Sequence, residues 1–163
     1  MSNYEVNYIT VREVSDDNLV KRYYESIIFD QPDARKELAG MINYWNEKKR
    51  GDLSDDAKLY KLILDYDNCI PRKDVEKQFI DYEYIIYNSA NNNAKTGVEK
   101  FRVILTLTEP IIAKDLSHWR KDENNRKQLL KFFKGVDVSS FDVGRFFYRP
   151  TKHDAGRRWS HSH

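Results

Sequence analysis

The sequence predicts a single α/β (α+β) domain over residues 1–163, in which helices pack against a mixed β-sheet. Three observations support this fold class. From residue 59 to residue 148 the apolar pattern gives the order β-α-β-β-α-β, which is typical of helices covering a sheet. Hydrophobic residues make up 40% of the chain and aromatic residues 13%, more than a disordered chain carries. The apolar runs are too short to span a membrane, so no membrane partner is expected.

The first third of the chain predicts one strand and two helices. Tyr4–Val14 alternates loosely and is partly β-branched, which favours a strand. Ser15-Asp16-Asp17 provides a helix N-cap, and apolar residues follow it at helical spacing. Pro32 ends this helix, and a second helix is predicted over Asp33–Lys49.

The remaining elements follow from apolar stretches that are separated by polar or proline-containing breaks. They are a strand at Leu59–Asp67, a helix from Pro71 to about Phe79, a strand at Tyr82–Tyr87, a polar loop over 88–99, a strand at Lys100–Leu107, a helix from about Lys114 to Lys134, a connection over Gly135–Gly144 and a short strand at Arg145–Tyr148.

Two acids close the strand Leu59–Asp67. Residues two apart on a strand point to the same face, so Asp65 and Asp67 are expected side by side at the strand end. Two carboxylates this close repel unless a cation lies between them, and their hard oxygens favour Mg²⁺ or Mn²⁺. Because an Ala replacement of either acid would relieve this repulsion, it is expected to leave the fold intact or slightly stabilised. The alternative is that Asp67-Asn68 is only a turn and that Asp65 caps the helix near Pro71.

Four segments of the chain, taken in order, carry a family resemblance. They are Asp65-Tyr66-Asp67-Asn68 at the end of a hydrophobic strand, Tyr82–Ser89, Lys100–Pro110 with its Phe-Arg-Val-Ile run, and Gly135–Pro150 with an acid, then an Arg, then an aromatic strand ending in Pro. Together they resemble the archaeo-eukaryotic primase-polymerases of phages and plasmids, over about Leu59 to Pro150. The resemblance implies a primase-like catalytic core. It implies a DNA-directed nucleotidyltransferase that joins nucleoside triphosphates on a single-stranded DNA template.

The resemblance also implies a role for individual residues. Asp65, Asp67 and Asp137 are the implied catalytic residues and ligands of two Mg²⁺ or Mn²⁺ ions, with Asp142 as the alternative third ligand. Asp137 is preferred because it follows an apolar residue, as in the family's motif, although either acid could be a turn residue. The implied nucleotide-binding residues are Ser89, Asn92, Lys100, Arg102 and Arg145.

The loop after Asn88 departs from the family's pattern. The family has a His there that helps to hold the phosphates, whereas this loop contains no His and Asn92 is the nearest positional match. An Asn carries no charge and transfers no proton. The departure supports an alternative, a catalytically weak or inactive module that binds single-stranded DNA or nucleotides. A rolling-circle-type initiator endonuclease ranks third, because no pair of His lies on an internal strand.

Basic residues gather towards the C-terminus. Residues 145–163 carry five Lys/Arg and one acid, Asp154. Arg145 can bind a triphosphate through its planar guanidinium, or it can form a salt bridge to Asp137 or Asp142. The residues expected to bind DNA are Arg149, Lys152, Arg157 and Arg158, with a solvated tail over 151–163 as the alternative.

Cysteine usage bears on the compartment. The chain has one cysteine, Cys69, and no Cys/His cluster, which favours a reducing cytosol. The resemblance implies a bacterial or phage-infected cell, and it adds a replicative helicase as an optional partner.

Overall fold

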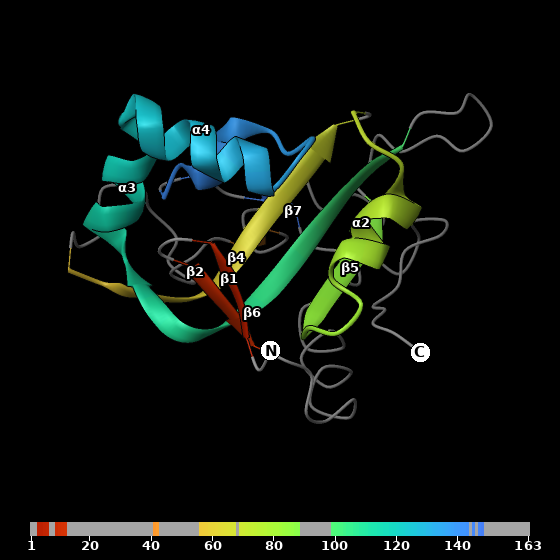
Figure 1. Cartoon of the computed structure of the whole chain (residues 1–163), viewed down its shortest axis with the longest axis horizontal. Helices are drawn as coiled ribbons and strands as arrows, with labels where there is room; N and C mark the ends of the chain where they lie inside the picture. Colours follow the sequence, from red (N-terminus) through yellow and green to blue (C-terminus); the bar gives the residue numbers. More distant parts are fainter. Residues whose placement is uncertain are drawn as a thin grey trace.

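The computed structural model of the chain describes residues 3–6, 9–12, 41–42, 56–67, 69–88, 99–143, 145 and 147–148. The elements are β1 (Asn3–Val6), β2 (Ile9–Arg12), β3 (Met41–Ile42), β4 (Lys58–Asp67), α2 (Arg72–Gln78), β5 (Tyr84–Asn88), β6 (Lys100–Ile112), α3 (Ala113–Lys121), α4 (Glu123–Phe132), the 3₁₀ helix η5 (Val138–Phe141) and β7 (Phe147–Tyr148) (Figure 1). In the described part of the chain no helix is both long and apolar enough to cross a membrane.

β6 is the central strand of the main sheet. β4 pairs along one side of it and β5 pairs with it over Tyr84–Asn88, both antiparallel. The hairpin of β1 and β2 joins at the pairing of Val11 with Leu107. β4 and β5 therefore run in the same direction with β6 between them, which makes β4-α2-β5 a split β-α-β unit.

The predicted class, helices packed on a sheet, is confirmed as an α+β arrangement. The predicted mixed sheet is wrong for the described residues, because every strand pair among them is antiparallel. A strand-helix-strand pattern usually predicts two parallel neighbours. Here β6 separates the two strands, and their spatial order is not visible in a linear pattern.

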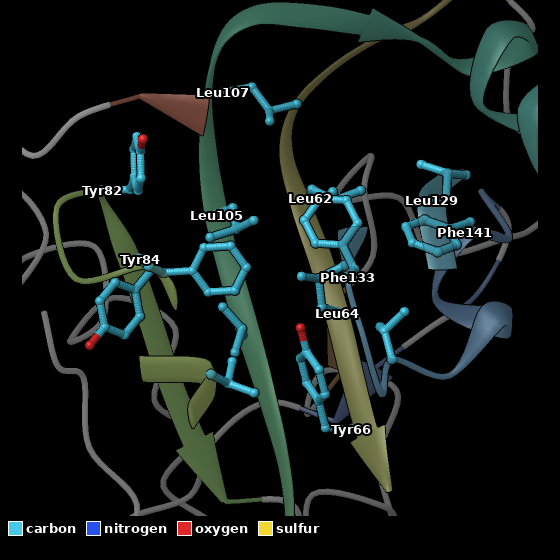
Figure 2. Close-up of a cluster of buried hydrophobic side chains, with 14 of the residues drawn as sticks. Leu62, Leu64, Tyr66, Tyr82, Tyr84, Leu105, Leu107, Leu129, Phe133 and Phe141 are labelled. Carbon is cyan, nitrogen blue, oxygen red and sulfur yellow. The ribbon is translucent and has the colours of Figure 1, made fainter. Parts of the chain in front are cut away.

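The main core lies between the sheet and the helices. Leu62, Leu64 and Tyr66 alternate along β4 and are fully buried, as the period of a strand requires. Tyr66 stacks on Phe101 of β6 with ring centroids 5.0 Å apart. Side chains from α2, α3, α4 and η5 cover the same face, and Figure 2 shows part of this cluster. They include Val75, Phe79, Leu116, Leu129, Phe133 and Phe141.

The opposite face of the sheet is also buried, and it mixes apolar and charged rows. The register aligns Ile63, Ile104 and Ile85 across β4, β6 and β5. Two residues further along each strand, on the same face, it aligns Asp65, Arg102 and Tyr87. All six residues are buried, so the second row takes an acid and a base out of water together.

The predicted elements match the structure to different degrees. The strand Leu59–Asp67, the helix from Pro71 to Phe79 and the strand Tyr82–Tyr87 are confirmed to within a few residues as β4, α2 and β5. The strand predicted at Tyr4–Val14 is instead the antiparallel pair β1 and β2. Alternation has the same period on both arms of a hairpin, so it does not reveal where the chain reverses.

The helix predicted over Asp33–Lys49 is wrong at Met41–Ile42, which form β3 and pair with β7. The rest of that helix, and the one predicted after Ser15, lie outside the described residues. The helix predicted over Lys114–Lys134 is two helices, α3 and α4. Asp122 separates them because its backbone is extended and its side chain caps α4, accepting from the Asn125 N–H at 3.0 Å.

The strand predicted at Lys100–Leu107 continues to Ile112 as β6, and the connection Gly135–Gly144 contains η5. The short strand predicted at Arg145–Tyr148 is reduced to Phe147–Tyr148. β7 pairs with β3 in a separate two-stranded sheet, so it is not a strand of the main sheet.

Gly135 is required for the turn that leads from α4 to η5. Its φ is +88°, and a Cβ at this position would lie 2.6 Å from Cγ2 of Ile70. We therefore expect Gly135→Ala to lower the free energy of unfolding by about 1–3 kcal/mol from the backbone alone, with the collision adding to it. Urea unfolding measures the change. Lys134→Ala, at the exposed neighbouring residue, is the control, and an equal effect of the two substitutions would contradict this role of Gly135.

Candidate functional site

The antiparallel pairing of β4 with β6 forms the base of a charged cluster. The register sets Asp65 opposite Arg102 and Asp67 opposite Lys100. Nε of Arg102 lies 3.3 Å from Oδ1 of Asp65, and Nζ of Lys100 lies 3.1 Å from Oδ1 of Asp67. Each predicted acid on β4 thus has a predicted base from β6 beside it.

Asp137 is held beside Asp65 at the edge of β4 that does not pair with β6. Its backbone N–H donates to the carbonyl oxygen of Asp65 at 2.8 Å, and the preceding Val136 forms a β-bridge with Tyr66. The backbone N–H of Asp65 donates to Oγ of Ser140 at 2.8 Å, and Ser140 is fully buried. The turn after α4 and the start of η5 are therefore fixed to the backbone of Asp65 by one backbone hydrogen bond and one serine hydroxyl.

Arg145 connects the acids of β4 and of this turn. Its guanidinium donates to Oδ2 of Asp65 at 2.9 Å and lies 3.7 Å from Oδ2 of Asp137. It also donates to Oγ of Ser139. Phe147 lies under it, with the guanidinium carbon 5.0 Å from the ring centroid, and the same ring lies 5.8 Å from that of Arg102. Arg145 thus forms the salt bridge to Asp137 that the sequence offered as the alternative to phosphate binding, and Asp65 is a second partner.

We call these six residues the charged cluster: Asp65, Asp67, Lys100, Arg102, Asp137 and Arg145. The exposure of its three acids and three bases increases from the interior to the surface. The side chains of Asp65 and Arg102 are 12% and 9% exposed, whereas that of Asp67 is 58% exposed. Asp65 and Asp67 lie on one face of β4 as predicted, but one belongs to the interior and the other to the solvent.

Asp137 is both a member of the cluster and a turn residue. It is the N-cap of η5, where its Oδ1 accepts from the Ser139 N–H at 3.0 Å. Burial raises the pKa of Asp137, but the hydrogen bonds from Ser139 and the charge of Arg145 outweigh this, so its pKa lies below the ordinary 3.8. Asp142 is the C-cap of η5, and its carbonyl oxygen accepts from the Arg145 N–H at 3.0 Å.

The cluster fits a divalent cation in the kind of its donors but not in their present arrangement. Carboxylate oxygens from Asp65, Asp67 and Asp137 are the hard ligands that Mg²⁺ and Mn²⁺ take. Among the described residues, however, no three acidic, His or Cys side chains are grouped so that they could share a metal ion. The oxygens of Asp65 contact two guanidinium groups instead.

The other six predicted site residues lie outside the described part of the chain: Ser89, Asn92, Arg149, Lys152, Arg157 and Arg158. Phe147 is 1% exposed and packs against the two guanidinium groups. Ser139 and Ser140 were missed. The only signal in the sequence was the Asp-x-Ser spacing of Asp137 and Ser139, which is typical of an Asx turn.

The contacts of Asp65 change one expectation about stability. The sequence suggested that removing Asp65 or Asp67 relieves a repulsion. In the structure each acid has its own base, and Arg102 is as deeply buried as Asp65. Asp65→Ala would leave a buried charge with a lost partner, which costs about 3–5 kcal/mol. For Asp65 the expected stabilisation is therefore wrong.

The comparisons with known proteins add no family. No protein-family model matches the chain, and neither a curated protein nor a solved structure does. None of the described strands carries a His, so they offer no pair of His of the kind that a rolling-circle initiator needs.

The lowered pKa of Asp137 predicts a pH-dependent stability. The carboxylate stabilises the fold at pH values above 3.8, and this contribution is lost as the pH falls through the lower pKa of the folded state. In metal-free buffer, Asp137→Asn should therefore be less stable than the wild type at neutral pH, and the difference should shrink below pH 3.8. Urea unfolding at both pH values tests this, and a difference independent of pH would contradict it.

Proposed function

We propose that this chain is a template-directed nucleotidyltransferase, a DNA primase or polymerase acting in the replication of a phage, plasmid or other mobile element. The observation that carries the proposal is the meeting of three separate segments. The ends of β4 and β6 and the turn around η5 each resemble a different primase motif, and their charged residues are in mutual contact. Chance resemblances in three segments would not have to converge on one cluster.

Each side of the cluster has a proposed role. Asp65, Asp67 and Asp137 would hold two divalent cations, which in such enzymes activate the attacking hydroxyl and neutralise the leaving pyrophosphate. Lys100, Arg102 and Arg145 would face the triphosphate of the incoming nucleotide. Phosphoryl transfer of this kind depends mainly on positioning and on the neutralisation of charge.

The ion pairs constrain how such a site can be loaded. Arg102 and Arg145 both contact Asp65, so they cannot serve a triphosphate fully while Asp65 keeps them. Arg145 is the more exposed of the two, with 25% of its side chain accessible. It is therefore the residue that we expect to exchange a carboxylate for a phosphate first, while the more deeply buried Arg102 still keeps Asp65 oriented.

A second candidate is a binding module of the same fold without chemistry. It is favoured by the arrangement of the acids, since no group of three potential metal ligands lies among the described residues. Such a module would bind single-stranded DNA or nucleotides within a replication complex. A titration with Mn²⁺ distinguishes the two: the enzyme should bind the ion with Asp67 and Asp137 intact and lose it when both are replaced by Asn, whereas the module should not bind it.

The exposed acid provides the sharpest test of the enzyme. Asp67 is solvent-exposed and forms an exposed ion pair with Lys100, so Asp67→Asn should cost less than about 1 kcal/mol of stability. It should nonetheless abolish nucleotide incorporation on a primed single-stranded template with Mg²⁺ or Mn²⁺. Asp56→Asn is the control, because Asp56 also forms an exposed Asp–Lys ion pair, with Lys114 at 3.4 Å. Retained incorporation by Asp67→Asn would show that the active site lies elsewhere.

Arg145 separates nucleotide binding from structure. Loss of a charge-assisted contact to a phosphate costs about 1.5–3 kcal/mol, so Arg145→Ala should raise the nucleotide Kd on the order of tenfold to a hundredfold. It should also lower the Tm, because Arg145 joins Asp65 to Asp137. Arg145→Lys keeps the charge and should lose less of both. Arg72→Ala, outside the cluster, is the control, and a lowered Tm with an unchanged Kd would leave Arg145 a purely structural residue.

A further inference from the structure

Positive charge in the described part of the chain is concentrated on the two helices that follow β6. Residues 113–135 carry seven Lys/Arg and three Asp/Glu. The described segments 56–67, 69–88, 99–112 and 136–145 each carry at least as many acids as bases. The charged cluster has as many acids as bases, so α3 and α4 should attract a long polyanion more strongly than the cluster does.

Two of the three basic side chains of α4, Lys127 and Lys131, lie on the side that faces away from the core. Leu129 is buried against the sheet, and Lys127 and Lys131 are each two positions from it, about 200° around the helix. Both lysines are exposed, and so are Asn124 and Gln128 on the same side. The exposed Glu123, one turn before Lys127, pairs with its Nζ at 3.1 Å, so this side carries one acid beside its two lysines. Four residues of an α-helix rise about 6 Å, so Lys127 and Lys131 start about 6 Å apart along the helix axis. We call Asn124, Lys127, Gln128 and Lys131 the basic face of α4.

The basic face leads to the charged cluster. The chain leaves α4 at Phe132, passes the exposed Lys134 and Gly135, and reaches Val136, which bridges Tyr66 beside Asp65 and Asp67. Figure 1 shows α4 lying along the sheet with its C-terminal end directed to the end of β4 that carries these acids. The side chains of Asp65 and Asp67 lie on the face of the sheet away from α4, so a nucleic-acid strand bound along the basic face would reach the cluster by passing the C-terminal end of β4, next to Asp137.

We propose that the basic face of α4 binds the sugar-phosphate backbone of the single-stranded nucleic acid on which the cluster acts, an inference that rests on the proposed function. The composition of the face favours this partner over a membrane or a protein. The exposed large hydrophobic residues of the described chain are Tyr60 and Ile80, and neither lies on α4. Cations and amides without an apolar anchor suit phosphates, whereas an interfacial helix or a protein hot spot needs a large apolar side chain.

The test measures binding without catalysis. The variant is Lys127→Gln/Lys131→Gln, and the probe is a fluorescein-labelled oligo-dT strand followed by anisotropy in the absence of nucleotide and divalent metal. We expect the Kd to rise on the order of tenfold at low salt, because two phosphate contacts are lost. The slope of log Kd against log salt should fall by about 1.4 in magnitude, at about 0.7 for each contact to a single strand.

The control is Lys73→Gln/Lys77→Gln on α2. These two lysines are also exposed, have the same spacing and give the same change in net charge. The control should leave Kd and slope close to those of the wild type. Equal weakening by both variants, no weakening by either, or no binding of the probe by the wild type would each overturn the proposal. So would a loss of binding to anionic vesicles without a loss of binding to oligo-dT.

The outcome is independent of the proposed chemistry. Asp67→Asn should bind oligo-dT as the wild type does, because Asp67 is in the cluster and not on α4. If Asp67→Asn keeps incorporation but the α4 variant loses oligo-dT, then the nucleotidyltransferase site is wrong and the basic face stands. If the α4 variant binds normally while Asp67→Asn loses incorporation, then the site stands and the basic face is wrong.

Discussion

The contacts of Asp65 hold together parts of the chain that are up to eighty positions apart. Its backbone N–H and C=O are bonded to Ser140 and Asp137, and its carboxylate is paired with Arg102 and Arg145. β4 lies at one edge of its sheet, and the outward groups of an edge strand need partners from elsewhere. At residue 65 these partners come from a turn and a serine hydroxyl in place of another strand. The sheet, η5 and the residues that follow are thereby fixed to one position.

Burial explains how the charges of the cluster are distributed. A charge that is removed from water must be paired and hydrogen-bonded, and the requirement weakens towards the surface. Asp65 is the most buried acid of the cluster and has two guanidinium partners, whereas the exposed Asp67 is paired with the lysine Lys100. The cluster is thus electrically complete without a ligand. A ligand that binds to it has to replace existing ion pairs rather than fill an empty space, which makes its net affinity the difference between two sets of contacts.

The sequence was sufficient where a local pattern determines the structure. Strand β4 and helix α2 follow from alternation and from Pro71, and the same-face relation of Asp65 and Asp67 follows from the period of a strand. The sequence was insufficient where partners are distant. That β6 lies between β4 and β5, that Met41–Ile42 pair with β7, and that Asp65 is buried all depend on which strands meet. The break at Asp122 was readable in principle, because Asp is a frequent N-cap, but the helical pattern continued on both sides of it.

The split β-α-β unit has a consequence for the order in which the protein folds. β5 and β6 are consecutive strands and can pair early, but β4 must wait for β6, since Asp67 pairs with Lys100 and Lys58 with Ile112. Contacts of such high sequence separation slow folding, because the entropy of closing a long loop is lost before the pairing rewards it. Arg145 joins last along the chain, so a nascent chain that has not yet exposed residue 145 lacks one of the two bases of Asp65. The main sheet should therefore form before the charged cluster is complete.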